Sequence, residues 1–219
     1  MISISILEAD LMCLAEEVDR SLLAGVDSIH IGYLDCSNDT AINFTLSISQ
    51  SLRDYGVRMP ISVLLNGSVT EELVKLLISS GVNCLYISPI AENVGGKILS
   101  LIKDSGCKSG LLINSEVSLY QYKSSFPMLD DVLIDLDTLQ TDYSNTQAIV
   151  TIKNTKGFIL NNGANVDIVV SGQLAESRIE LLSEVGVESF IIGKLIFSSV
   201  DYYATVSKVK RQINLNKAP

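Results

Sequence analysis

A helical stretch that ends in glycine and is followed by a short apolar run recurs along the chain. Three clear copies are "LLAGVDSIHI" (22–31), "LISSGVNCLYI" (77–87) and "LSEVGVESFII" (182–192). Glycine just beyond a helix adopts the left-handed conformation that other residues resist. The run after it is short and rich in Ile, Val and Leu, which is typical of a strand buried on both faces of a parallel sheet. The repeat therefore predicts strands that alternate with helices.

Eight such strands can be placed, each followed by a helix candidate. They lie near residues 2–7, 27–33, 60–65, 83–88, 107–113, 131–136, 166–171 and 188–193. Eight alternations in 219 residues predict an α/β protein with a closed (β/α)8 TIM barrel, formed as a single domain over residues 1–219. An open doubly wound sheet is the alternative, although no GxGxxG motif follows the first strand to favour a dinucleotide-binding fold.

Amphipathic stripes indicate the helices. Leu14, Val18 and Leu22 share one face after Asp10, which is a candidate N-cap. The weakest part of the pattern is the segment 138–165, because it is rich in Asn and Thr and lacks a clean helical period.

Composition narrows the class of protein. Hydrophobic residues make up 47% of the chain and charged residues 19%, as in a globular protein. A net charge of −9, with no cluster of Lys and Arg, argues against a nucleic-acid partner. No apolar run reaches the roughly 20 residues that span a bilayer, and the first residues lack the basic start of a signal peptide. We therefore expect a cytoplasmic protein with free thiols, because the cysteines fit neither a zinc site nor a disulfide framework; they are Cys13, Cys36, Cys84 and Cys107.

Function in such a barrel resides at the carboxyl ends of the strands. The polar and glycine residues expected there are few for an enzyme of this type. They are Ser5, Glu8, His30, Gly32, Asp35, Ser62, Asn66, Ser88, Asn114, Asp135, Asp137, Ser171, Gly172, Gln173, Gly193 and Lys194.

Six segments, in order and at matching spacing, resemble the ribulose-phosphate 3-epimerase family from end to end. They are "SISILEADL" (3–11), "SIHIGYLDC" (28–36), "PISVLLNGSV" (60–69), "KSGLLINSEVSL" (108–119), "DIVVSGQLAES" (167–177) and "FIIGKLIF" (190–197). The resemblance implies a ribulose-phosphate-binding barrel. It also implies a family activity, the epimerisation of a ketopentose phosphate at C3.

The resemblance further implies that two aspartates act as acid and base, and that two histidines join them in holding a divalent metal. His30 matches the first histidine, whereas Gly32, Leu64 and Ser171 stand at the other three positions. One imidazole does not hold a catalytic metal. We therefore expect no metal cofactor, and an epimerase activity that is lost or altered. The remaining catalytic candidates are His30, Asp35 and Asp137.

The phosphate site of the family is changed in part. Gly172 and Gly193 match its glycines, whereas Gln173 and Lys194 are replacements. A lysine beside a glycine turn can bind an anion, so we expect a phosphorylated sugar or another small anion as ligand. The candidate substrate-binding residues are Ser5, His30, Gly172, Gly193 and Lys194.

Alternatives remain open at this point. Lys194 could instead pair with Glu8, Asp135 or Asp137, and Asp35 could have a structural role in a turn. The chain could be an isomerase or epimerase for a different sugar phosphate, with a relocated site built on His30, Asp135, Asp137 and Lys194. It could also be a non-catalytic subunit; the resemblance implies a homo-oligomer.

Overall fold

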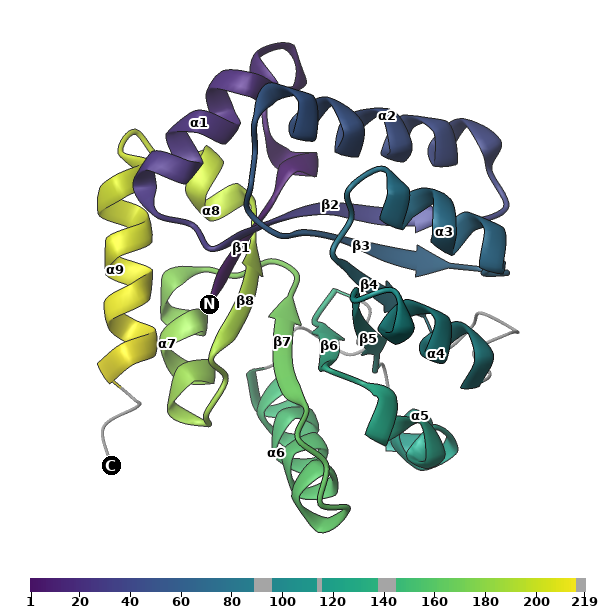
Figure 1. The fold of residues 1–219 in the computed structure, drawn as a ribbon. Helices are drawn as coiled ribbons and strands as arrows, with labels where there is room; N and C mark the ends of the chain where they lie inside the picture. Colours follow the sequence, from purple (N-terminus) through teal and green to yellow (C-terminus); the bar gives the residue numbers. More distant parts are fainter. Residues whose placement is uncertain (89–95, 114–115, 138–144, 216–219) are drawn as a thin grey trace.

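The computed structural model describes residues 1–88, 96–113, 116–137 and 145–215 (Figure 1). Asn114, a candidate from the sequence, lies outside the described residues. None of the helices in the described part of the chain combines the length and apolar character needed to cross a membrane.

Eight parallel strands close into a barrel in the order of the sequence. Strand β1 pairs with β2 on one side and with β8 on the other, so the sheet has no free edge. This confirms the predicted (β/α)8 barrel and excludes the open sheet. The strands are β1 (Ile2–Ser5), β2 (Ser28–Asp35), β3 (Ile61–Asn66), β4 (Cys84–Ile87), β5 (Lys108–Leu112), β6 (Asp131–Asp135), β7 (Asp167–Ser171) and β8 (Ser189–Ile192).

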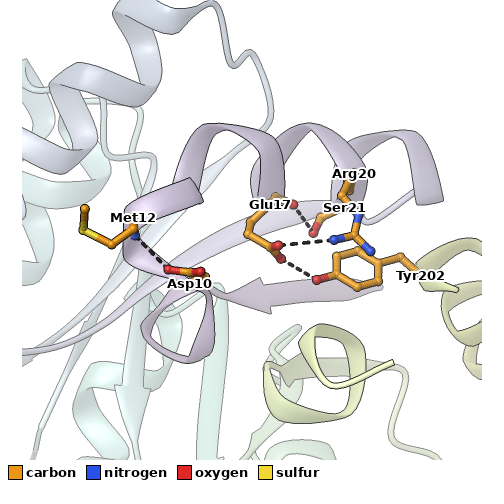
Figure 2. A network of polar contacts seen from close by, with 6 residues as sticks. All are labelled: Asp10, Met12, Glu17, Arg20, Ser21 and Tyr202. Carbon is orange, nitrogen blue, oxygen red and sulfur yellow. Dashed lines mark hydrogen bonds and ion pairs between the residues drawn. The ribbon is translucent and has the colours of Figure 1, made fainter. Parts of the chain in front are cut away.

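Helices surround the strands (Figure 1). They are α1 (Leu14–Ala24), α2 (Asp39–Tyr55), α3 (Glu71–Ser79), α4 (Gly96–Asp104), α5 (Glu116–Gln121), α6 (Asn145–Asn161), α7 (Glu176–Glu184), α8 (Lys194–Phe197) and α9 (Tyr202–Leu215). Three short 3-10 helices are η1 (Ile6–Glu8), η2 (Leu11–Cys13) and η3 (Lys123–Met128). As predicted, left-handed glycines end helices: Gly25 follows α1 and Gly56 follows α2. Asp10 caps η2 rather than α1, because its side chain accepts a hydrogen bond from the Met12 amide (Figure 2).

Helix α6 lies within the segment that showed the weakest pattern. Its buried face combines alanine and threonine with larger apolar residues. The buried residues are Ala148, Thr151, Ile152, Thr155, Phe158 and Ile159. Threonines on the inner face blur the contrast between the two sides of the helix, which explains the poor helical period in the sequence. Residues 138–144 of that segment lie outside the described residues.

The strands are apolar on both faces, which produces two separate clusters. The larger cluster joins the outward faces of the strands to the helices. The second consists of Leu64, Cys84, Tyr86, Leu112, Leu133, Val169 and Ile191 from six strands, and it fills the barrel interior. Gly110 makes room for the Tyr86 ring, because a Cβ at Gly110 would lie 2.3 Å from Tyr86 Cδ1.

The first and last helices are joined by one polar cluster (Figure 2). Tyr202 of α9 donates its hydroxyl to Glu17 of α1, and Arg20 Nη1 lies 3.3 Å from the same carboxylate. The Arg20 guanidinium also stacks 4.0 Å from the centre of the Tyr202 ring. Burial, together with the hydrogen bond to Glu17, raises the pKa of Tyr202 to about 12. This cluster stabilises the packing of α9 against α1, beside the pairing of β8 with β1.

A buried carboxylate lies at the amino end of β6. Asp131 is 3% exposed; its Oδ2 is 3.5 Å from the Tyr86 hydroxyl, and its Oδ1 is 4.0 Å from Lys108 Nζ. Burial raises the pKa of the Asp131 carboxyl, and Lys108 opposes this shift only in part.

We predict that the free energy of unfolding depends less on pH in Asp131→Asn than in the wild-type protein. The folded-state pKa of Asp131 lies above the ordinary 3.8, so wild-type protein loses free energy of unfolding as the pH rises through this window. Asparagine does not ionise, so the variant should gain stability relative to wild type between acidic and neutral pH. Urea unfolding at a series of pH values measures the difference. The opposite slope would mean that attraction to Lys108 outweighs burial.

Candidate functional site

The carboxyl ends of all strands meet at one end of the barrel, here called the mouth. The strand register brings several predicted residues together there: Ser5 lies beside His30, and Asp135 lies beside Ser171. Turn η1 follows β1 directly and places Leu7 and Glu8 over this end.

His30 points into the barrel and is 6% exposed. Its Nδ1 lies 2.9 Å from Ser62 Oγ, while the Ser62 hydroxyl faces the Ile29 carbonyl at 3.3 Å. If Ser62 donates to that carbonyl, Nδ1 carries the proton and donates to Ser62. The ring also meets the edge of Tyr86, with centroids 6.2 Å apart. Burial lowers the pKa of His30 to about 4, so the imidazole is neutral at physiological pH.

Gly32 has a backbone that does not suit a side chain. The pairing of β2 with β3 shifts register between His30 and Gly32, and Gly32 has φ +116°. A Cβ at Gly32 would lie 2.2 Å from Leu7 Cδ1 and 2.7 Å from Leu7 Cγ. Leu7 therefore fills the space in which a carboxylate at position 32 would begin. Sequence reasoning missed Leu7, although a glycine within a strand is a known signal of a bulge or a close approach.

The other two metal positions are equally unsuited to a metal. Leu64 is 6% exposed and packs in the apolar interior cluster, and Ser171 offers a neutral hydroxyl at the end of β7. Within the described ranges, no three His, Cys, Asp or Glu side chains are grouped so that they could share an ion. The residues at this mouth do not fit the divalent metal that the family resemblance implies.

Asp35 forms a local turn at the end of β2. Its Oδ1 accepts hydrogen bonds from the Ser37 amide at 2.9 Å and the Ser37 hydroxyl at 2.7 Å. These bonds lower the pKa of Asp35. Both partners lie two residues along the chain, which favours the structural role for Asp35 over the catalytic one.

Asp137 accepts a hydrogen bond from a backbone amide in the loop after β7. Its Oδ1 lies 3.2 Å from the Gln173 amide, and its own amide donates to Asp135 Oδ1 at 2.9 Å. Gly172 has φ +111°, and a Cβ there would lie 3.2 Å from the Asp137 carboxylate. A carboxylate of the chain thus sits where the sequence predicted a ligand anion. Burial raises the pKa of the neighbouring Asp135.

A pocket of about 540 Å³ lies beside the mouth, between the starts of α7 and α8. Its lining combines backbone at Gly172, Ala175 and Gly193 with the side chains of Lys194 and Glu8. Lys194 is exposed and has no carboxylate within 4 Å among the described residues, so the considered pairing with Glu8, Asp135 or Asp137 is not formed. Sequence reasoning missed Thr205 of α9, which also lines this pocket.

We predict that His30 stays neutral throughout the physiological pH range. It is the only histidine, so its ring gives an NMR signal that needs no assignment. The titration midpoint should lie near the folded pKa of about 4, with the proton on Nδ1 above it. The unfolded chain binds this proton first, so stability should fall as the pH drops from about 6.5 through that window. A midpoint near 6.5 would contradict the buried imidazole.

We predict that Gly32→Ala destabilises the protein more than Gly56→Ala. Gly56 has a similar φ of +107° but open space around its Cβ, so its variant isolates the backbone strain. The clash with Leu7 should add about 1–3 kcal/mol at position 32, measured by urea unfolding. The double variant Leu7→Ala with Gly32→Ala should recover most of that excess. Equal losses in the two glycine variants would show that Leu7 moves aside freely.

Comparisons with known proteins show the family of the chain. A family model described as "Ribulose-phosphate 3 epimerase family" matches residues 1–197. Ribulose-phosphate 3-epimerase of Escherichia coli (strain K12) is 26% identical over 219 residues, covering 97% of this chain and 96% of that protein. The enzyme of Buchnera aphidicola subsp. Schizaphis graminum is 28% identical over 215 residues, covering 95% of this chain and 92% of that protein.

Solved structures confirm the barrel. 3-keto-L-gulonate-6-phosphate decarboxylase from Vibrio cholerae superposes with a TM-score of 0.76 at 13% identity, covering 100% of this chain and 99% of that one. A 3-hexulose-6-phosphate synthase gives a TM-score of 0.71 at 12% identity, covering 97% and 99%. With the family model matched over nearly all of its strands and helices, the chain belongs to the ribulose-phosphate 3-epimerase family.

Proposed function

We propose that this chain is a diverged family member that binds a small anionic molecule, of the phosphorylated sugar class, without metal-dependent 3-epimerisation. The observation that carries the proposal is the backbone at Gly32. Glycine stands where the family places a carboxylate, and its φ of +116° and the contact with Leu7 both disfavour a side chain there.

The loss of epimerisation follows from the chemistry. A proton next to a carbonyl is weakly acidic, so its transfer needs a base on each face and a positive centre for the developing oxyanion. Gly32 and Ser171 offer no base, because a serine without a general base is a poor proton acceptor. His30 is neutral and buried, so it does not supply the positive charge.

Anion binding is supported by the pocket between α7 and α8. The starts of both helices border it, and Ala175 at the start of α7 has no side-chain cap. Glu8 and Glu176 also line this pocket, and Glu176 pairs with Lys208. Lys194 adds a positive charge that no described carboxylate neutralises within 4 Å. Because Asp137 already accepts the Gln173 amide, the anion would be held mainly from the β8 side. The curated relatives are named for ribulose phosphate, a ligand of this class.

A relocated active site is the second candidate, and Asp135 favours it. This carboxylate follows the inward-facing Leu133, lies beside Ser171 in register, and has a pKa raised by burial, as a general base often has. In this alternative Asp135 would act on a different sugar phosphate. A non-catalytic subunit of a homo-oligomer is the third alternative and predicts no small-molecule ligand.

We predict no turnover of ribulose 5-phosphate in the presence of Zn²⁺, Mn²⁺ or Fe²⁺. A coupled assay for xylulose 5-phosphate measures it, with the Escherichia coli epimerase as positive control. Titration calorimetry should detect binding of ribulose 5-phosphate or inorganic phosphate, weakened about tenfold in Lys194→Ala. Lys75→Ala on α3 is the matched control, because Lys75 is also exposed but pairs with Glu71.

Turnover at the rate of the control enzyme would overturn the proposed loss of activity. Absence of any heat signal or thermal shift with these anions would instead favour the subunit alternative. Activity on another sugar phosphate that disappears in Asp135→Asn would establish the relocated site.

A further inference from the structure

A second pocket lies on the outer wall of the barrel, away from the mouth. Its volume is about 640 Å³, and it lies between the α5–η3 segment and the second half of α6, two helices that pack side by side. It shares no lining residue with the pocket at Lys194. We call it the outer pocket. A cavity of this size is typical of a small-molecule site.

The floor of the outer pocket is a fixed aromatic group. Phe158 is buried and meets Phe126 at 5.0 Å between ring centroids. Tyr120 stands edge-on to Phe158 at 5.2 Å and 85°, yet 72% of Tyr120 is exposed. Packing therefore holds the Tyr120 ring at one edge and leaves it open to solvent, which suits stacking with a planar ring.

The charge of the outer pocket is opposite to that of the protein. The chain carries a net charge of −9, yet none of the residues that line this pocket is acidic. Its charged side chains are Lys123 and Lys153, one from each wall. Neither lysine has a carboxylate within 4 Å in the part of the chain that the structure describes. Two ammonium groups that face one cavity favour an anion.

Gly157 gives a second, independent indication that the outer pocket binds a ligand. It lies inside the 17-residue helix α6, where glycine is among the poorest helix formers. Its φ is not positive, and a Cβ there would meet nothing within 4 Å. Neither backbone conformation nor packing therefore requires glycine at this position. What glycine does provide is a bare helix backbone on the wall of the pocket, which a ligand can approach closely.

We propose that the outer pocket binds a nucleoside phosphate. The base stacks on Tyr120 and lies against the backbone at Gly157. The phosphate lies between Lys123 and Lys153, and the amide of Asn161 at the rim offers hydrogen bonds to polar edges of the base. This site is separate from the mouth and does not depend on the function proposed there.

Titration of the full chain with AMP tests the proposal. The titrations use Lys194→Ala, so that binding of phosphorylated sugars at the mouth is weakened. We expect saturable AMP binding, and binding about tenfold weaker for adenosine and for ribose 5-phosphate, since each lacks one of the two recognised groups. Tyr120→Ala and Lys153→Ala should each weaken AMP binding about tenfold. The matched controls are Tyr203→Ala, which removes a tyrosine of similar exposure (67%), and Lys75→Ala; both should bind AMP as wild type does.

Gly157 variants separate ligand binding from a structural effect. Gly157→Ala should raise the melting temperature by about 2 °C while it weakens AMP binding. Gly157→Gln, which fills the pocket, should abolish binding and leave the protein folded. The proposal is overturned if AMP does not bind at millimolar concentration, or if it binds Tyr120→Ala and Gly157→Gln as tightly as wild type. Binding that Lys194→Ala abolishes would place AMP at the mouth and would equally overturn it.

Discussion

The filling of the barrel interior is the constraint on which the rest of the structure depends. Eight strands closed at this size leave space for side chains but not for a channel. Tyr86 is the largest side chain in that space, and it fits because Gly110 has none. The ring lies against His30 toward the mouth and near Asp131 toward the amino end. The low pKa of His30 and the raised pKa of Asp131 both follow from this apolar packing.

At the mouth, both the backbone and the side chains are unsuited to the metal site that the family resemblance implies. At Gly32 the strand shifts register and the chain adopts a conformation that suits glycine, with Leu7 packed above. At the β7 loop, Asp137 satisfies an amide that could otherwise hold a ligand. We therefore expect that replacing single residues would not rebuild the family site, because Leu7 and Asp137 occupy the space and the amide that such a site would use.

The sequence allowed prediction of the fold because its signals were local. A glycine after several helices and an apolar run for each strand located all eight strands, and the pattern was weakest in the segment that contains α6. Gly172, Gly193 and Lys194, which the resemblance suggested as binding residues, line one pocket, and their role in binding stays a prediction. The contacts that define the site were not predictable, because Leu7 meets Gly32, and Asp137 meets Gln173, across loops far apart in the chain. No sequence motif indicated the outer pocket, because its lining comes from the α5–η3 segment and α6, which meet only in the folded barrel.

Closure of the barrel also sets an order of events during synthesis. Strand β1 pairs with β8, and Ile2 lies opposite Phe190. One edge of β1 therefore stays unpaired until β8 has been synthesised. The Glu17–Tyr202 contact forms later still, because α9 follows β8 in the chain. A nascent chain that lacks α9 exposes one apolar side of α1, and before β8 emerges it also presents an unpaired strand edge. The period in which β1 and α1 have been made but β8 and α9 have not is therefore one in which the nascent chain is prone to aggregation.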